Sequence, residues 1–205
     1  MDQLQYVAVV PVKPPAVGKS RLGLSSDRRR ELAAAFALDT VTACLATGAV
    51  AQVLAVTDDA AFARDLAAAG CAVLPDGPSG DLNTSLVLAV AEAARRWPEL
   101  RPVAVCADLP ALRTDDLAEA LAAAASHESA FVSDTSGAGT TMYTATADAF
   151  LPRFGPDSRA AHLEGGAIEI AGLLPSLRQD VDDLVDLARA DALGLGPHTA
   201  RLEMP

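Results

Sequence analysis

The feature that most constrains the fold of this chain is the regular alternation of short apolar runs with longer amphipathic ones. Residues 6–12 read Tyr-Val-Ala-Val-Val-Pro-Val, a β-branched run typical of a strand that is buried on both faces. Residues 27–48 follow with apolar side chains at helical spacing, between Asp27 as a helix cap and Gly48. Further strands are expected at 50–57, 71–74, 103–107, 130–133 and 141–146, with helices after the cap Asp58, before Pro98 and from the cap Thr114.

This order of elements continues along the chain without an internal repeat or a long linker. Strands that alternate with helices build a mainly parallel sheet with helices on both faces. We therefore predict that residues 1–205 form a single, Rossmann-like α/β domain of three layers with a mainly parallel sheet. In such folds ligands bind at the carboxyl ends of the strands, so the loops that follow the strands are expected to carry the chemistry.

Charge and composition exclude several classes of protein. The 16 basic and 27 acidic residues give a net charge of −11, which argues against nucleic-acid binding. No apolar run approaches the ~20 residues needed to cross a bilayer, and the N-terminus lacks the positive stretch of a secretory signal. The three cysteines have no CxxC spacing, so neither a disulfide framework nor a zinc site is expected. We expect a cytoplasmic protein with no membrane partner.

The loop after the first predicted strand concentrates positive charge in an otherwise acidic chain. Six of the sixteen basic residues fall between positions 13 and 30, and both lysines of the chain, Lys13 and Lys19, are among them. Together with Arg21 they suit the phosphates of a nucleotide. The alternative for the three arginines at 28–30 is the solvated start of a helix.

Three carboxylates are candidates for a metal site. Asp108 directly follows the buried run 103–107, where strand packing does not explain a charged side chain. Asp180 and Asp182 are two residues apart, so on an extended segment they point to one face. Magnesium is bound by one or two carboxylates together with substrate phosphates, which predicts Mg²⁺ at these residues. The alternative for Asp108 and Asp182 is helix capping, although Thr114 already provides a cap for the helix that follows Asp108.

Motifs of other chemistries are incomplete in this chain. Gly18-Lys19-Ser20 resembles a phosphate loop, but that motif needs a glycine five residues earlier, where Lys13 stands. There is no GxSxG elbow and no glycine fingerprint of a dinucleotide site after the first strand. The three histidines are too scattered for a local set of metal ligands.

Seven short motifs, in order along nearly the whole chain, resemble those of one known family. They are Pro11-Val-Lys13, Lys19-Ser-Arg-Leu22, Asp81-Leu-Asn-Thr84, Ala107-Asp-Leu-Pro110, Gly137-Ala-Gly-Thr140, Phe154-Gly-Pro-Asp-Ser158 with His162, and Asp180-Val-Asp182. The family they resemble is the phosphoenolpyruvate/2-phospho-L-lactate guanylyltransferase family of deazaflavin coenzyme F(420) biosynthesis. That resemblance implies the nucleotidyltransferase fold of the nucleotide-diphospho-sugar transferases and molybdenum-cofactor guanylyltransferases.

The resemblance also implies a reaction and a set of ligands. The expected enzyme joins GMP from GTP to phosphoenolpyruvate, with Mg²⁺ as cofactor and pyrophosphate as the second product. Asp108 and Asp182 match metal-binding acids of the family. Its positions for the phosphorylated three-carbon acid are matched by Thr140, Gly155 and Ser158.

The resemblance also implies positions for the nucleotide. Lys19 and Arg21 match the loop that faces the triphosphate, with Lys13 beside it, and Asp81 and Asn83 fall where this fold contacts the base or ribose. A phosphate monoester is already ionised near neutral pH, so the attacking oxygen needs no general base and no histidine is expected near these loops. Catalysis is then the alignment and neutralisation of two anions by Mg²⁺, Lys19, Arg21 and Asp108.

Several alternatives stay open at the level of sequence. The acid is phosphoenolpyruvate or 2-phospho-L-lactate, and residues 154–158 favour the first because they most resemble bacterial members. Ala138 replaces a threonine that the family often carries, and Ser158 has helix capping as its alternative role. A sugar-1-phosphate or molybdopterin nucleotidyltransferase is a rival enzyme, and a GTP-binding regulatory module is a rival class. The resemblance also leaves open a handover of the unstable product to the next enzyme of the pathway.

Overall fold

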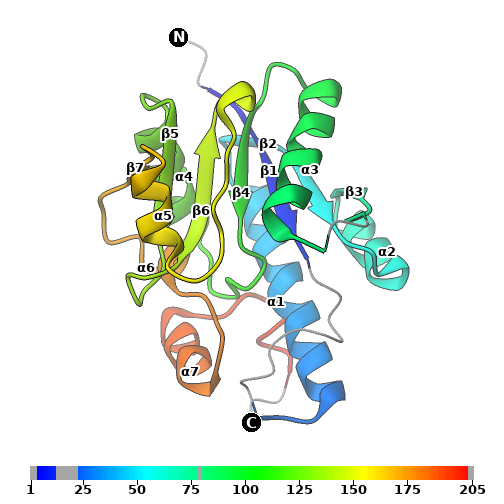
Figure 1. Ribbon diagram of the computed structural model, residues 1–205. Coiled ribbons are helices and arrows are strands. Elements are labelled where there is room, and N and C mark those ends of the chain that lie inside the picture. Colours follow the sequence, from blue (N-terminus) through cyan, green and yellow to red (C-terminus); the bar gives the residue numbers. More distant parts are fainter. Residues whose placement is uncertain (1–3, 13–22, 78–79, 203–205) are drawn as a thin grey trace.

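The computed structural model describes residues 4–12, 23–77 and 80–202 of the chain (Figure 1). Its strands are β1 (Tyr6–Pro11), β2 (Val50–Val56), β3 (Ala72–Leu74), β4 (Arg101–Val105), β5 (Ser129–Ser133), β6 (Thr140–Ala145) and β7 (Ile168–Glu169). Its helices are α1 (Ser26–Ala46), α2 (Ala60–Ala68), α3 (Leu82–Arg96), α4 (Thr114–Ala124), the 3₁₀ turn η2 (Ala147–Ala149), α5 (Ser158–Glu164), α6 (Pro175–Arg178) and α7 (Leu184–Leu193).

All seven strands belong to one sheet, in the order β3-β2-β1-β4-β6-β5-β7. The pairs β1–β2, β1–β4, β2–β3 and β5–β7 are parallel, which confirms the predicted, mainly parallel sheet. Strand β6 runs antiparallel to both of its neighbours, β4 and β5. A short turn joins β5 to β6, and strands joined by a short turn pair antiparallel. The start of β6 therefore lies at the same edge of the sheet as the end of β4.

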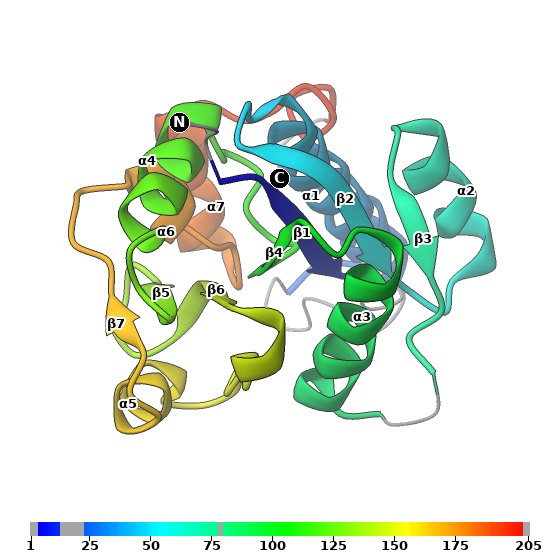
Figure 2. The same ribbon diagram turned by 90° about the horizontal axis from the view of Figure 1, so that it is seen from above.

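Helices cover both faces of the sheet, so the predicted three layers are confirmed (Figure 2). Successive side chains of a strand point to opposite faces. On β1, Tyr6, Ala8 and Val10 pack in the core beneath α1, α2 and α4. Val7 and Val9 pack on the other face against α3. The apolar run of β1 is thus buried on both faces, as its sequence predicts.

The C-terminal part of the chain packs against the first half of α1. Leu32 and Phe36 of α1 are buried in a third cluster with Val181 and with Leu187 of α7. Burial of these apolar side chains fixes the segment before α7 next to the carboxyl edge of the sheet. None of the helices in the described ranges is long and apolar enough to span a membrane.

Two of the predicted helix caps are wrong by one or two residues. The cap of α1 is Ser25, whose side chain accepts a hydrogen bond from the main-chain N–H of Arg28, and not Asp27. The cap of α2 is Asp59, and the neighbouring Asp58 instead accepts hydrogen bonds from the main chain at residues 76 and 77. Neighbouring polar residues compete for a cap, and the path of the preceding loop decides between them.

Candidate functional site

A cavity of about 980 Å³ lies at the carboxyl edge of the sheet. It extends from the end of β4 to the turn between β5 and β6, and from there to the start of α7 (Figure 1). The side chains on its wall are mostly polar, and they come from five separate stretches of chain: Leu82; Cys106 and Asp108; 134–140; 154–158; and 179–189. This is the edge at which the alternation of strands and helices predicts a ligand.

The three predicted metal-binding carboxylates lie together in this cavity. One carboxylate oxygen from each of Asp108, Asp180 and Asp182 lies within 4.8 Å of the other two. Val181, between the two later aspartates, is fully buried, which turns both of its neighbours to the opposite side. Three converging carboxylates fit a hard cation such as Mg²⁺, which takes oxygen ligands.

Neither Asp108 nor Asp182 caps a helix. Helix α7 is capped by Asp183, whose side chain accepts hydrogen bonds from the main-chain N–H groups of Val185 and Asp186 at 2.8 and 2.9 Å. Helix α4 starts at Thr114 itself and has no side-chain cap, so the prediction that Thr114 is the cap is wrong. The capping alternative for the two aspartates is therefore also wrong.

The turn between β5 and β6 forms a second wall of the cavity. Asp134 holds it: one carboxylate oxygen accepts from the main-chain N–H groups of Ala138 (3.1 Å) and Gly139 (3.0 Å). A Cβ at Gly139 would collide with the side chain of Asp134, so this close approach needs glycine. Ala138, the departure from the family pattern, is exposed on the wall of the cavity.

Thr140 and Ser158 meet beside the loop that carries Gly155, whose carbonyl accepts from the main-chain N–H of Ser158 at 3.2 Å. The hydroxyl of Ser158 donates to Oγ1 of Thr140 at 3.1 Å, and both side chains are buried. Ser158 is the first residue of α5, and its hydroxyl bonds to β6 instead of capping the helix. The structure therefore brings together two of the residues predicted to hold the phosphorylated acid.

The loop 154–158 is fixed by Asn83 of α3. Both ends of the Asn83 amide bond to the main chain of Phe154: Nδ2 donates to its carbonyl (2.9 Å) and Oδ1 accepts from its N–H (2.8 Å). Gly155 follows with φ of 141°, a conformation that L side chains rarely adopt. The absence of a side chain at Gly155 leaves its backbone open to the cavity.

Asp81, predicted with Asn83 to contact the base or ribose, is the cap of α3. Its carboxylate accepts from the main-chain N–H of Thr84 at 2.8 Å and from the Thr84 hydroxyl at 2.6 Å. These hydrogen bonds lower the pKa of Asp81. Both residues thus hold the start of α3 and the loop beside it, while Leu82 between them lines the cavity.

His162, which is part of a family motif but was given no role from the sequence, is buried beside Thr140 and Ser158. Its Nδ1 lies 3.1 Å from Oγ1 of Thr140, so the expectation that no histidine lies near these loops is wrong. Burial lowers the pKa of His162 to about 4. A hydrogen bond with the main chain of Ser158 opposes this shift, and the charge of Arg153 adds a smaller lowering. The spacing of Ser158 and His162, four residues apart on one helix, is the signal that could have found it.

The predicted phosphate-binding cations, Lys13, Lys19 and Arg21, lie outside the described residues. The described wall of the cavity contains a cation that the sequence did not single out, Arg189 of α7, which pairs with Asp186 at 3.2 Å. Cys106 and Gln179 also line the cavity and were not predicted.

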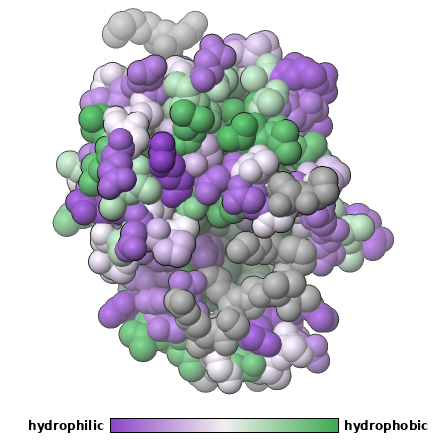
Figure 3. Space-filling model, in the orientation of Figure 1, coloured by the Kyte–Doolittle hydropathy of each residue, from purple (hydrophilic) through white to green (hydrophobic). Residues whose placement is uncertain are grey.

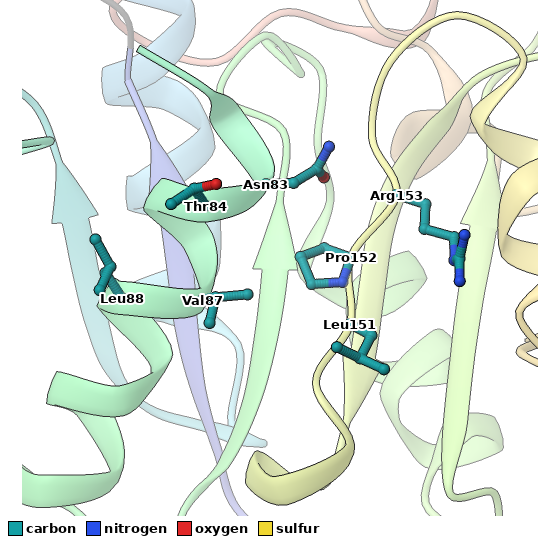
Figure 4. A pocket seen from close by; sticks show the side chains of 7 residues that line it. All are labelled: Asn83, Thr84, Val87, Leu88, Leu151, Pro152 and Arg153. Atoms are coloured by element: carbon teal, nitrogen blue, oxygen red, sulfur yellow. The ribbon is translucent and has the colours of Figure 1, made fainter. Parts of the chain in front are cut away.

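A second, shallower groove lies on the other side of the loop that follows β6. It has a volume of about 390 Å³ and is lined by Val87 and Leu88 of α3 and by residues 151–153. Val87 points across it toward Leu151 and Pro152 (Figure 4). Hydrophobic side chains gather over α3 in the space-filling view (Figure 3). Its polar side chains are Asn83, Thr84 and Arg153, and no carboxylate lines it, so the larger cavity with its three converging carboxylates is the candidate functional site.

Comparison with known proteins gives a family match and several similar enzymes. Residues 6–171 match the model of the family described as "Guanylyl transferase CofC like". The phosphoenolpyruvate guanylyltransferase of Streptomyces coelicolor is 50% identical over 203 residues, covering 96% of this chain and 95% of that protein. The enzyme of the same name from Thermomonospora curvata is 47% identical, covering 98% of this chain and 89% of that protein.

Solved structures show the same fold at low identity. A 4-diphosphocytidyl-2C-methyl-D-erythritol synthase has a TM-score of 0.64 at 12% identity, covering 93% of this chain and 99% of its own. A nucleotidyl transferase from Methanothermobacter thermautotroptrophicus has a TM-score of 0.59 at 20% identity, covering 92% of this chain and 97% of its own. The predicted nucleotidyltransferase fold is confirmed, and the chain belongs to the CofC-like guanylyl transferase family.

Proposed function

We propose that this protein joins GMP from GTP to phosphoenolpyruvate and releases pyrophosphate. The observation that carries the proposal is a single cavity whose wall contains both a cluster of three carboxylates and the paired hydroxyls of Thr140 and Ser158. Such a cavity has groups for a metal-bound triphosphate and for a second, smaller anion. The names of the relatives, which are 42–50% identical over nearly the whole chain, support the same reaction.

In this reaction a phosphate oxygen of phosphoenolpyruvate attacks the α-phosphorus of GTP. A new phosphorus–oxygen bond forms, the bond from the α-phosphorus to the oxygen that bridges it to the β-phosphorus breaks, and pyrophosphate leaves. The attacking oxygen carries no proton near neutral pH, so no side chain has to remove one. The task of the protein is to align two anions and to offset their charge.

Each of the two groups of residues has a proposed role. Asp108, Asp180 and Asp182 would hold Mg²⁺, which when bound offsets the negative charge of the phosphates. Thr140, Ser158 and the backbone at Gly155 would bind the acid. Lys13, Lys19 and Arg21 stay predictions for the triphosphate.

A contact of Asp81 and Asn83 with the base or ribose also stays a prediction. Their hydrogen bonds within α3 and to Phe154 give both residues a second role, in the shape of the site. A handover of the product to a later enzyme stays a prediction as well.

The experiment is a pyrophosphate-release assay with a panel of nucleotides and acceptors. GTP with phosphoenolpyruvate is expected to give turnover that needs Mg²⁺. The two candidate acids differ only at the bond between carbons 2 and 3, a difference that pockets resolve by about 1–3 kcal/mol. A clear preference for 2-phospho-L-lactate would therefore overturn the choice of acid alone.

The same panel tests the rival functions. Turnover with CTP or with a sugar 1-phosphate, and none with either three-carbon acid, would favour another nucleotidyltransferase of this fold. Binding of GTP without pyrophosphate release from any acceptor would favour a regulatory module. Either result would contradict the proposed reaction.

A further inference from the structure

His162 is held more rigidly than its position on a short helix requires. Its ring is buried, with 1% of the residue exposed. It stacks on Tyr143 of β6 at a centroid distance of 4.7 Å and on Phe131 of β5 at 5.3 Å, and the edge of Phe154 packs against it at 5.5 Å. Three aromatic rings from different segments therefore fix the plane of the imidazole.

The hydrogen bonds of the ring fix which nitrogen carries the proton. The main-chain N–H of Arg153 donates to Nε2 of His162 at 3.0 Å, so Nε2 has no hydrogen of its own. Burial keeps the ring neutral, because it lowers the pKa of His162 to about 4. A neutral imidazole has one N–H, which must then be on Nδ1. That N–H faces Oγ1 of Thr140, 3.1 Å away. The main chain of Ser158 is a second hydrogen-bond partner of the ring.

This protonation state determines the direction of the next hydrogen bond. Oγ1 of Thr140 accepts from Nδ1 of His162 and from the hydroxyl of Ser158. A hydroxyl oxygen has two lone pairs and one hydrogen, so the hydrogen of Thr140 is directed away from both donors. Thr140 lines the large cavity, and its hydroxyl can therefore donate to an anion there. If Nδ1 of His162 had no hydrogen, it would accept the hydroxyl hydrogen of Thr140. Oγ1 of Thr140 would then present a lone pair to the anion, which is unfavourable.

We propose that His162 is a positioning residue that, together with the hydroxyl of Ser158, holds the hydroxyl of Thr140 as a hydrogen-bond donor for the phosphorylated acid. This inference rests on the proposed function, because it assumes that the acid binds beside these residues. His162 takes no part in proton transfer: both of its ring nitrogens are already engaged, and the attacking phosphate oxygen needs no base.

Two substitutions separate the two nitrogens of the ring. The side-chain nitrogen of asparagine lies about where Nδ1 of histidine lies, whereas a glutamine amide reaches about as far as Nε2. His162→Gln therefore keeps an acceptor for Arg153 and loses the donor to Thr140, and His162→Asn does the reverse. We expect His162→Gln to raise the KM for phosphoenolpyruvate roughly tenfold, the effect of weakening one hydrogen bond to a charged group. His162→Asn keeps the donor to Thr140, so its increase in the KM for phosphoenolpyruvate is expected to be several times smaller than that of His162→Gln.

The KM for GTP is the internal control, and it is expected to stay unchanged in both variants. KM does not depend on the folded fraction of the enzyme, so partial unfolding cannot mimic the expected pattern. Equal rises for both substrates, or the same KM for phosphoenolpyruvate in both variants, would overturn the proposal, since His162 would then act through packing alone.

Nitrogen NMR of the labelled wild-type protein tests the inference without turnover. The signals of His162 are expected to show a protonated Nδ1 and an unprotonated Nε2 at neutral pH. A proton on Nε2 would overturn the proposal whatever the kinetics show. If the wild-type protein turns over none of the acids, the proposed function is wrong. The NMR result remains informative in that case, because a proton on Nδ1 is what allows His162 to hold Thr140 as a donor.

Discussion

The main-chain N–H of Val181 donates to the carbonyl oxygen of Asp108 at 3.1 Å. This hydrogen bond joins the end of β4 to a segment more than seventy residues later in the sequence. With the side chain of Val181 buried in the core beside α1, the residues on either side of it are held facing Asp108. A neutral hydrogen bond and one buried apolar side chain thus bring three like charges together.

Asp108→Asn is expected to abolish magnesium-dependent turnover without unfolding the protein. The substitution keeps the shape of the side chain and removes one negative charge from the cluster. Loss of a proposed metal ligand should lower kcat at least roughly 100-fold, which is several kcal/mol of transition-state stabilisation.

Thermal melting with and without Mg²⁺ measures binding directly. Mg²⁺ is expected to raise the melting temperature of the wild type by mass action, and to do so much less for Asp108→Asn. Asp65→Asn, on the exposed side of α2, is the matched control for loss of a negative charge. Asp182→Asn should behave like Asp108→Asn, because Asp183 and not Asp182 caps α7. Retained turnover and an unchanged response to Mg²⁺ would contradict the metal assignment.

Asn83→Ala is expected to weaken the binding of the acid more than that of GTP. The variant loses both hydrogen bonds to the main chain of Phe154 and so loosens the loop 154–158. The free energy of unfolding should fall by about 1–3 kcal/mol, because two main-chain groups of the loop lose their partners. The measurements are chemical denaturation and the two KM values. Thr84→Ala, on the same turn of α3, leaves these hydrogen bonds in place and serves as the control.

The opposite change in the two KM values would support the prediction made from the sequence for Asn83. A rise in the KM for GTP, with the KM for phosphoenolpyruvate unchanged, would mean that Asn83 contacts the base or ribose.

The fold could be predicted well from sequence because its signals are local. The β-branched run of β1 and the apolar spacing of α3 each identify an element without knowledge of the rest of the chain. The insertion of β6 between β4 and β5 could not be predicted, because strand order depends on packing between distant segments. The wrong caps, Asp27 and Asp58, have polar neighbours that compete for the same N–H groups.

In the candidate site, too, features with a local signal could be predicted from sequence, and features that depend on distant segments could not. The alternation of side chains along a strand predicts that Asp180 and Asp182 share a face. The role of His162 depends instead on the main-chain N–H of Arg153 and on a hydroxyl of β6. A main-chain donor has no identity in the sequence, so no motif reveals this contact.

Ser158→Ala is expected to raise the KM for the phosphorylated acid roughly tenfold and to leave the KM for GTP almost unchanged. The variant removes a buried hydroxyl that bonds to Thr140 on the wall of the cavity. Without this donor the hydrogen of Thr140 is no longer held toward the acid. A hydrogen bond to a charged group contributes about 1.5–3 kcal/mol, and about 1.4 kcal/mol corresponds to a factor of ten. Steady-state kinetics with each substrate varied in turn make the measurement.

Ser136→Ala is the matched control for Ser158→Ala, because Ser136 lines the same cavity but is exposed. A similar loss of acid affinity in both variants, or equal rises for both substrates, would argue that Ser158 only supports the loop.

The stability of the protein at acid pH is expected to depend on His162. Its pKa in the folded protein is about 4, below the ordinary value of about 6.5, because burial disfavours the charged ring. The ring faces Tyr143 from β6 and Phe131 from β5, neither of which is charged in this range, and the charge of Arg153 lowers the pKa further. Between these two values the unfolded chain binds a proton that the folded protein excludes.

The stabilising contribution of the neutral ring is therefore fully present above about pH 6.5 and is lost as the pH falls toward about 4. His162→Gln cannot bind this proton, so the difference in free energy of unfolding between wild type and variant should shrink across that window. The carboxylates titrate alike in both proteins, so their contribution to the pH dependence cancels in this difference. Urea denaturation at a series of pH values measures it, with His127→Gln, outside the aromatic cluster, as the control. A difference that stays constant from pH 7 to pH 4 would mean that His162 binds its proton equally in the folded and the unfolded protein, which the hydrogen bond from Arg153 to Nε2 forbids.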